Sequence, residues 1–506
     1  MVEPGKYIIM RKLKRFSAAY FFALCFICTS ALPLKAQQSE KPNILLFVAD
    51  DMNWRDCQPY GNTDVVTPHI AELAEEGMSL DNMYTATAMS SPTRQQLYTG
   101  LFPVRSGAYP NHTVVYDGVR SMGHHFGELG YRVALVGKRH YGPAEAFPIE
   151  FLGGRHHDNG KGQDIDVDRI RPILNQDNKP FFVVVASNQP HSPWNRGSSK
   201  IYEDKDLTIP EYMVDCKETR ENLERYYAEI TYTDSLLGQS LDYLEASGKK
   251  DNTIVIFTSE QGSSFPFAKW TCYDLGLKTA FIVRWPGEVQ GGTRNPAMTQ
   301  YVDVVPTLVE AAGGSPGHVN TGSIDEHGHN GFDGQSFLDV LKNEKQQHRN
   351  YVYGVQTTRG IFSGSVCYPV RSVRSQNYKY ILNLNSSTPF YNMVTTHENG
   401  IYQTWLQETS GKPDRHDYVM RYLQRPKEEL YDIRKDPWEL NNLADEAGYE
   451  QVKQRLRKAL HDWMVQQGDQ GIDTELKAIE RQPRWNEKGW RSNEEQQNHK
   501  ILEGTQ

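Results

Sequence analysis

The sequence predicts an α/β protein with a large, mostly parallel sheet between helices, followed by a smaller C-terminal part built on an antiparallel sheet and a helix. Four continuous runs of apolar and β-branched residues, separated by helical patterns, are typical of strands covered on both faces. They occupy residues 43–51, 132–140, 180–191 and 253–262. The length of 506 residues exceeds what one hydrophobic core usually supports, which indicates more than one structural unit.

The composition is that of a globular protein, with 38% hydrophobic and 23% charged residues. The net charge of −8 argues against nucleic acid as a partner. Any anionic ligand would therefore need positive charge that is concentrated locally.

The first 36 residues read as a signal peptide. A basic stretch at 10–15 precedes an apolar run at 16–32, and Ala36 offers a small-residue cleavage point. An uncleaved membrane anchor is the alternative, but the run is short for a span and ends at Pro33. We expect a periplasmic or secreted protein with no membrane span after cleavage.

Four cysteines remain after this cleavage, and their wide spacing resembles neither a zinc site nor a dense disulfide scaffold. One or two disulfides and buried free thiols both remain open. The four are Cys57, Cys216, Cys272 and Cys367.

Charged, amide or imidazole side chains directly follow each of the four predicted strands. Any one of these clusters also fits a polar loop or a helix cap. In open α/β sheets, however, ligands bind beyond the carboxyl ends of the strands, so four such clusters together favour one shared site. The residues are Asp50, Asp51, Lys138, His140, His191, Glu260 and Gln261.

The chemistry of this set points to transfer of a sulfuryl or phosphoryl group. Its carboxylate and amide oxygens suit Ca²⁺ or Mg²⁺ better than zinc. Lys138, Arg94 and Lys269 supply positive charge for a tetrahedral anion, and histidines exchange protons near neutral pH. Ser90, on a turn stiffened by Pro92 before a predicted helix, would be the nucleophile.

Residues 90–100, SSPTRQQLYTG, resemble the signature of the type I sulfatases, Cys/Ser-x-Pro-x-Arg followed by Leu-x-Thr-Gly. Segments at 41–51, 130–142, 255–262 and 429–444 resemble the family in the same order, so the resemblance covers most of the mature chain. It implies the alkaline-phosphatase-like fold and a serine-type bacterial member.

The resemblance also implies residue roles. A maturase acting on the Ser90 motif would oxidise Ser90 to formylglycine (3-oxoalanine), whose hydrate attacks sulfur. Calcium would be held by the modified Ser90 and by four further residues: Asp50, Asp51, Glu260 and Gln261. Arg94 would steady the aldehyde, Lys138 and Lys269 would bind sulfate, His140 would be the base, and His191 would serve the leaving group. The sequence departs from the family at Glu260-Gln261, where Asp followed by Asn or His is usual.

Within the family, residues 137–151, 257–270 and 367–385 resemble the branch of heparan N-sulfatase (N-sulfoglucosamine sulfohydrolase). The predicted substrate is a sulfate ester or sulfamate of a sulfated glycan, such as a glycosaminoglycan. Residues 354–366 do not match that branch. Arg359 and Arg371 are candidate substrate contacts, while a solvated loop charge and a structural ion pair are the alternatives.

We expect a signal peptide at 1–36, a catalytic domain at 37–355, a C-terminal subdomain at 356–475 and a polar tail at 476–506. Two rival functions remain open. One is a phosphatase or phosphodiesterase of the same superfamily, typically with two zinc ions; the other is an inactive relative that binds glycan.

Overall fold

The computed structural model describes residues 41–154, 164–176, 179–203 and 205–481. The predicted signal peptide and residues 482–506 of the predicted tail lie outside the described residues. Within the described part of the chain, no helix is both long and apolar enough to cross a membrane.

The larger sheet has the order β4-β3-β5-β1-β6-β8-β2-β7, and β9 pairs with β2. The run from β4 to β6 is parallel, and β8 is antiparallel to both β6 and β2. This arrangement confirms the predicted mixed, mostly parallel sheet. The strands are β1 Asn43–Ala49, β2 Met78–Tyr84, β3 Arg132–Gly137, β4 Glu150–Gly153, β5 Phe181–Ala186, β6 Thr253–Ser259, β7 Lys278–Thr279, β8 Phe281–Arg284 and β9 Thr293–Gln300.

The four strands predicted from sequence, β1, β3, β5 and β6, are neighbours in this sheet. Their register brings their carboxyl ends level: Ala186 of β5 pairs with Gly137 of β3 and with Val48 of β1, and Ala49 pairs with Ser259 of β6. The polar residues that follow each strand therefore emerge at one edge.

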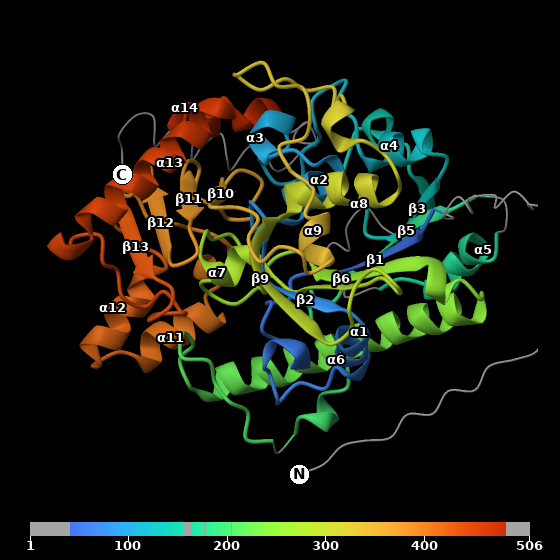
Figure 1. The fold of residues 1–506 in the computed structure, drawn as a ribbon. Coiled ribbons are helices and arrows are strands. Elements are labelled where there is room, and N and C mark those ends of the chain that lie inside the picture. Colours follow the sequence, from blue (N-terminus) through green and yellow to red (C-terminus); the bar gives the residue numbers. More distant parts are fainter. Residues whose placement is uncertain (1–40, 155–163, 177–178, 204, 482–506) are drawn as a thin grey trace, which may run out of the picture. The chain divides into compact units, whose positions relative to one another are not determined.

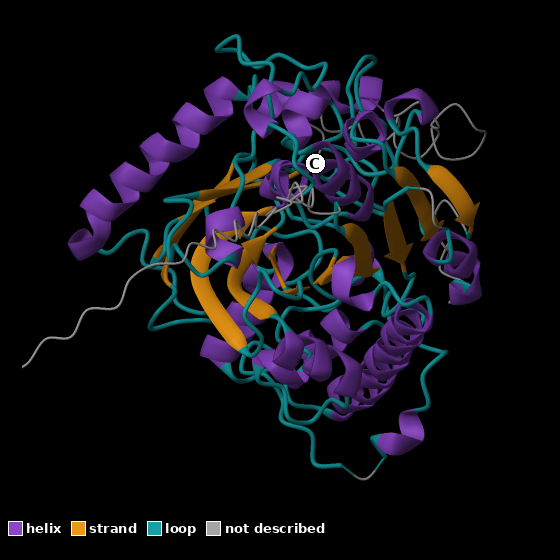
Figure 2. Ribbon diagram, turned by 45° about the vertical axis from the view of Figure 1, so that its right-hand side comes forward, coloured by secondary structure: helices purple, strands orange, loops and turns teal. Residues whose placement is uncertain are grey.

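Helices cover both faces of this sheet, as Figures 1 and 2 show. Because side chains alternate along a strand, Leu45 and Phe47 of β1 face one layer while Ile44 and Leu46 face the other. The first layer includes α1 (Pro68–Glu76) and the long α6 (Lys217–Ala246). The second includes α2 (Ser90–Thr99), α4 (Met122–Glu128) and α8 (Val304–Ala311).

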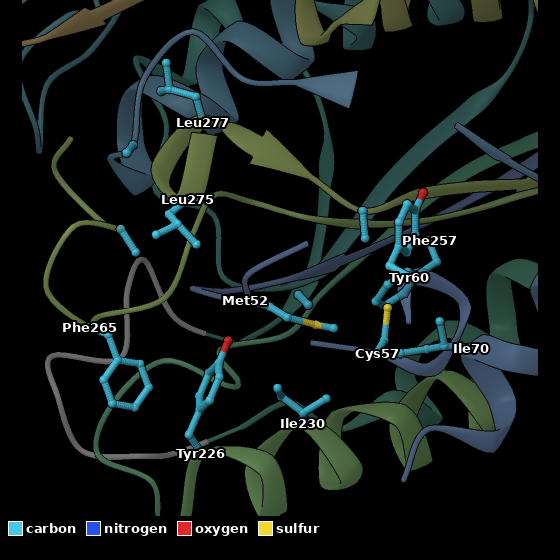
Figure 3. Close-up of a cluster of buried hydrophobic side chains, with 14 of the residues drawn as sticks. Met52, Cys57, Tyr60, Ile70, Tyr226, Ile230, Phe257, Phe265, Leu275 and Leu277 are labelled. Atoms are coloured by element: carbon cyan, nitrogen blue, oxygen red, sulfur yellow. The ribbon is translucent and has the colours of Figure 1, made fainter. Parts of the chain in front are cut away.

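Figure 3 shows part of the first layer, where Tyr226 and Ile230 of α6 lie on the side of Met52, which follows β1, and Phe257 of β6 lies beside Tyr60. The Tyr226 hydroxyl also accepts a hydrogen bond of 3.0 Å from the backbone N–H of Asn53. The loop that directly follows β1 is thus anchored by both apolar packing and a buried hydrogen bond.

A second, antiparallel sheet has the order β10-β11-β12-β13 (Val352–Gln356, Val370–Arg374, Tyr378–Asn383 and Glu428–Asp432). Helix α13 (Glu450–Gln466) packs on one face, and α11 (Ile401–Glu408) and α12 (Pro413–Arg421) pack on the other. The predicted sheet and helix are confirmed. The predicted boundary at residue 355 falls inside β10, and the domain limits stay a prediction.

The four cysteines of the described chain are free thiols.

The remaining helices of the described chain are short. The α-helices are α3 Pro103–Ser106, α5 Arg171–Leu174, α7 Asp274–Leu277, α9 Leu338–Leu341, α10 Met393–Thr396 and α14 Ile472–Lys477. The 3₁₀ helices are η1 Gln58–Tyr60, η2 Ala144–Ala146, η3 Val167–Ile170, η4 Ser199–Ile201, η5 Lys250–Asn252, η6 Tyr301–Asp303, η7 Pro316–His318, η8 Ala447–Tyr449 and η9 Ala478–Arg481.

Candidate active site

Backbone hydrogen bonds continue between neighbouring strands just beyond their carboxyl ends. The N–H of Lys138 donates to the carbonyl of Ala186 at 2.9 Å, and the N–H of Glu260 donates to that of Ala49 at 2.8 Å. The N–H of Asp50 reaches the Gln189 carbonyl at 2.9 Å. The first polar residues after the strands are therefore held as firmly as the strands themselves, which fixes the directions of their side chains.

Ser90 is the first residue of α2, a helix that is buried along its whole length. Its Oγ lies 3.0 Å from Lys138 Nζ, 3.4 Å from Asp50 Oδ1 and 3.5 Å from Gln261 Nε2. The N-terminus of a helix carries partial positive charge from unpaired N–H groups. The hydroxyl thus sits where an anion is favoured, among the ends of three different strands.

Each of the three carboxylates of the site faces a cation. Asp50 pairs with Lys138, and Glu260 pairs with Arg94. Lys269 Nζ lies 2.6 Å from Asp51 Oδ2. All these side chains are nearly or fully buried, so their charges are screened little by water.

Burial alone would raise the pKa of Asp50, but Lys138, His191 and Arg94 outweigh it and hold that pKa below its usual value. Burial likewise opposes ionisation of Asp51, yet Lys269 and His191 lower its pKa. Burial would lower the pKa of Lys269, but Asp51, Asp50 and Glu260 together outweigh it and raise that pKa. Asp50 and Asp51 are therefore ionised, and Lys269 is protonated, near neutral pH.

These residues also supply the oxygen donors that a hard divalent cation requires. Glu260 Oε1 and Gln261 Oε1 are buried and have no hydrogen-bond partner among the described residues. Together with the carboxylates of Asp50 and Asp51 they fit calcium, which accepts carboxylate and amide oxygens in variable geometry. Among the described residues, no group of three or more His, Cys, Asp or Glu side chains is spaced to hold a metal ion.

Two predicted histidines lie at this edge. His191 Nδ1 donates to the carbonyl of Ser192 at 2.5 Å, which leaves Nε2 to face Asp51 Oδ2 at 3.5 Å. His140 is buried, and its Nε2 lies 2.8 Å from Nδ1 of His112. The structure thus brings His191 to the carboxylates and joins His140 to a third histidine.

Backbone strain gathers in the segments that carry these side chains. Asp51, His112, His140, Phe267 and Trp270 all have positive φ, between 48° and 68°. Residues other than glycine adopt this left-handed conformation at a cost of about 1–3 kcal/mol, and such residues cluster at functional sites. In the chain, Lys269 lies between two of these residues, Phe267 and Trp270.

Sequence reasoning missed two side chains of the site. His112 contacts His140, and the Ser264 hydroxyl donates to Asp51 Oδ2 at 2.9 Å. Neither residue directly follows a predicted strand, so the rule that located the other residues did not apply. His112 stands in Pro-Asn-His-Thr, which reads as an ordinary turn.

The two candidate substrate arginines have different surroundings. Arg371 is 0% exposed and forms a two-pronged ion pair with Asp469. This ion pair fits the structural alternative, and a contact of Arg371 with substrate stays a prediction. Arg359 lies closer to the site: its carbonyl accepts a hydrogen bond of 3.1 Å from the N–H of Asn111, next to His112. Its contact with substrate remains a prediction.

A doubly covered α/β sheet with a buried hydroxyl, three carboxylates and three cations at the carboxyl edge defines a hydrolase of anionic esters. Comparison with known families makes this specific. The family model described as Sulfatase matches residues 42–315, and the model described as N-sulphoglucosamine sulphohydrolase, C-terminal, matches residues 262–399. The chain belongs to the sulfatase family, which confirms the resemblance found in the sequence.

Two relatives extend this result. An ulvan-active sulfatase of Formosa agariphila is 32% identical over 446 residues, covering 87% of this chain and 83% of the relative. Human N-sulphoglucosamine sulphohydrolase is 27% identical over 479 residues, covering 87% and 93%. A solved structure described as a complex with its substrate D-glucosamine-2-N,6-O-disulfate has a TM-score of 0.65 at 20% identity, covering 86% and 99%. The protein is a sulfuric ester hydrolase.

Proposed function

We propose that this enzyme removes sulfate from saccharides of a sulfated polysaccharide, using formylglycine made from Ser90 and a bound calcium ion. One observation carries the proposal: the Ser90 hydroxyl lies within 3.5 Å of Lys138, Asp50 and Gln261, at the start of a buried helix. A serine in this position can attack an anion that the neighbouring cations hold.

The cationic residues of the site bind the sulfate group and hold the neighbouring residues in position. Lys138 and Lys269 bind the sulfate oxygens, because both ammonium groups reach the carboxylate edge near Ser90. Arg94 pairs with Glu260, and its Nη1 donates to the carbonyl of Lys138 at 3.1 Å, which keeps both residues in position. The formyl hydrate would supply the attacking hydroxyl, and calcium would offset the negative charge around it.

Proton transfer falls to the histidines. His191 Nε2 faces the carboxylate edge and donates a proton to the sugar oxygen or nitrogen that leaves. His140 accepts a proton, and its hydrogen bond with His112 determines which ring nitrogen is available. Asp50, Asp51, Glu260 and Gln261 would hold the calcium.

The substrate class follows from the relatives and from the charge of the site. The named relatives act on ulvan and on N-sulfoglucosamine, so both O-sulfated and N-sulfated sugars belong in the test. We place the reaction in the periplasm or outside the cell on the basis of the predicted signal peptide, and a maturase is expected to oxidise Ser90.

The test is a sulfate-release screen with protein produced together with a serine-type maturase. N-sulfated glucosamine is compared with O-sulfated glucosamine, galactosamine, uronic acid and rhamnose. We expect turnover of at least one sugar, loss of turnover in Ser90→Ala, and a Ser90 peptide lighter by two hydrogens in mass spectrometry.

Ser91→Ala is the matched control, since the Ser91 hydroxyl donates to the Thr113 carbonyl at 3.2 Å and makes no contact with the cations of the site. It is expected to keep most of the turnover. Full turnover in Ser90→Ala would show that the nucleophile is another group.

A further inference from the structure

A cavity of about 290 Å³ lies beside the candidate active site. His112 connects the two, because its ring lines the cavity while its Nδ1 contacts His140. The volume is at the lower end of the range for ligand pockets, which is enough for one sugar unit. A group bound there would lie next to the residue that is being desulfated.

The cavity wall combines flat apolar rings with one cation. Tyr141 and Phe147 pack with ring centroids 4.6 Å apart, and the Arg139 guanidinium lies over the ring of Phe151 at 4.3 Å. Phe151 is 36% exposed, so this side of the cavity is accessible. Aromatic faces of this kind suit the C–H face of a pyranose ring, and a few polar groups then fix its orientation.

Arg139 is the charged group of this wall. Among the described residues it forms no ion pair, and its Nε is buried without a hydrogen-bond partner. Lys138, the preceding residue, reaches the Ser90 hydroxyl, and His140, the following residue, contacts His112. A buried guanidinium edge next to an accessible cavity is suited to a planar carboxylate, which it can bind through two parallel hydrogen bonds.

We propose that this cavity is a second saccharide subsite, in which Arg139 binds the carboxylate of a uronic acid linked to the sulfated sugar. The inference rests on the proposed function, because it places a neighbouring sugar beside the one that loses sulfate. It makes this enzyme selective for polysaccharides in which sulfated sugars and uronic acids are linked.

The experiment compares three substrates with wild-type protein, Arg139→Gln and Arg139→Lys. The first is the sulfated monosaccharide that the wild type hydrolyses, and the second is the same sugar linked to glucuronic acid. The third is the carboxyl-reduced disaccharide, in which glucose replaces glucuronic acid. Arg132→Gln is the matched control, since Arg132, at the start of β3, pairs with Glu150 on the surface, whereas Arg139 follows the end of this strand.

We expect Arg139→Gln to lower kcat/KM for the glucuronic acid disaccharide by about 10- to 100-fold, mainly through KM. Its kcat/KM for the monosaccharide and for the carboxyl-reduced disaccharide should stay within about twofold of the wild type. Arg139→Lys should recover part of the loss, and Arg132→Gln should show none. Thermal melting checks that each variant is folded.

Three results would overturn the inference. An equal loss on all three substrates would place Arg139 at the reaction centre, and no loss on any would exclude the subsite. A larger loss on a disaccharide that carries sulfate in place of the carboxylate would identify a second sulfate as the ligand.

A failure of the proposed function can be distinguished from a failure of the subsite inference. If the wild type releases no sulfate from any sugar, calorimetric titration with the unsulfated disaccharide of glucosamine and glucuronic acid still tests the subsite. Binding that is at least tenfold weaker in Arg139→Gln supports it, and equal binding contradicts it.

Discussion

His112 and His140 share a hydrogen bond of 2.8 Å between Nδ1 and Nε2, although 28 residues separate them and both have positive φ. Both residues lie on loops, so the orientation of each ring depends on its contact with the other. The pair fixes the orientation of His140, the histidine that we propose accepts a proton.

His112→Ala is expected to lower kcat by about tenfold with little change in KM, because it removes an orienting hydrogen bond worth about 1–1.5 kcal/mol. His112→Gln, which retains a hydrogen-bonding group, should recover part of the rate. Steady-state kinetics on the best sulfated sugar measures both. His124→Ala, in α4, is the control, and an unchanged kcat in His112→Ala would contradict the positioning role.

Calcium should stabilise the protein after treatment with a chelator. At 100 times its Kd the ion adds about 2.7 kcal/mol to the free energy of unfolding, which raises the melting temperature. Gln261→Leu should weaken calcium binding at least about tenfold, since it removes a donor oxygen. Melting curves across a calcium titration give both values, without reference to turnover.

Gln300→Leu is the control for this series, because Gln300 is a buried glutamine whose amide contacts the Tyr353 carbonyl at 2.6 Å, away from the carboxylates. It should lower the melting temperature but keep the calcium response. An identical calcium Kd in Gln261→Leu would remove that residue from the ligand set, and no response in the wild type would count against calcium altogether.

Asp469→Ala should destabilise the protein by about 3–5 kcal/mol, because it leaves Arg371 charged and buried without its partner. The double variant Arg371→Met/Asp469→Leu should recover much of this loss. Urea unfolding measures the free energies, and Glu128→Ala, at an exposed ion pair with Arg120, should change them little. If the double variant keeps the wild-type KM, Arg371 does not contact substrate.

Glu475 should make stability depend on pH. Its carboxyl is buried, which raises its pKa to about 7, although hydrogen bonds from Thr358 and the charge of Arg371 oppose this. Between about pH 4.5 and 7 the folded state keeps a proton that the unfolded state has lost, so the free energy of unfolding falls as pH rises. The loss amounts to at most about 3 kcal/mol.

Glu475→Gln keeps the acceptor for the Thr358 N–H, a bond of 2.9 Å, but does not ionise. Chemical unfolding at several pH values should therefore show a flatter profile in this variant and greater stability than the wild type at pH 8. A wild-type profile that rises over this interval would show that the carboxyl is ionised at little cost in the folded state.

Much of the fold was predictable because four runs of apolar residues are unusually continuous. Phe47 faces one helical layer and Val184 faces the other, and both are fully buried. Strands that are covered on both faces in this way are apolar at successive positions, which is a clear pattern in the sequence. The carboxyl ends of parallel strands meet at one edge, so the sequence alone was enough to assign Asp50, Lys138 and Glu260 to a shared site.

Long-range contacts between loops could not be predicted in this way. The pairing of His112 with His140 depends on backbone conformations that no periodic pattern encodes. Arg371 was expected to contact substrate because of its position in the sequence. In the structure Asp469, 98 residues later, pairs with it in the interior. Charge partners that are distant in sequence leave no local signal.

The loop that carries His112 is held by residues near the C-terminal end of the described chain. The guanidinium of Arg481 donates to the carbonyls of Gly107 and Val114 at 3.1 Å and lies over the ring of Tyr116. Arg481 follows Thr113 by 368 residues. At a synthesis rate of about 5–20 residues per second, the ribosome reaches it roughly 20–70 seconds later. The last catalytic side chain named above, Lys269, is added roughly 10–40 seconds before Arg481 at this rate. During those seconds the nascent polypeptide contains every catalytic side chain but lacks the clamp on this loop, so assembly of the catalytic centre is completed late in translation.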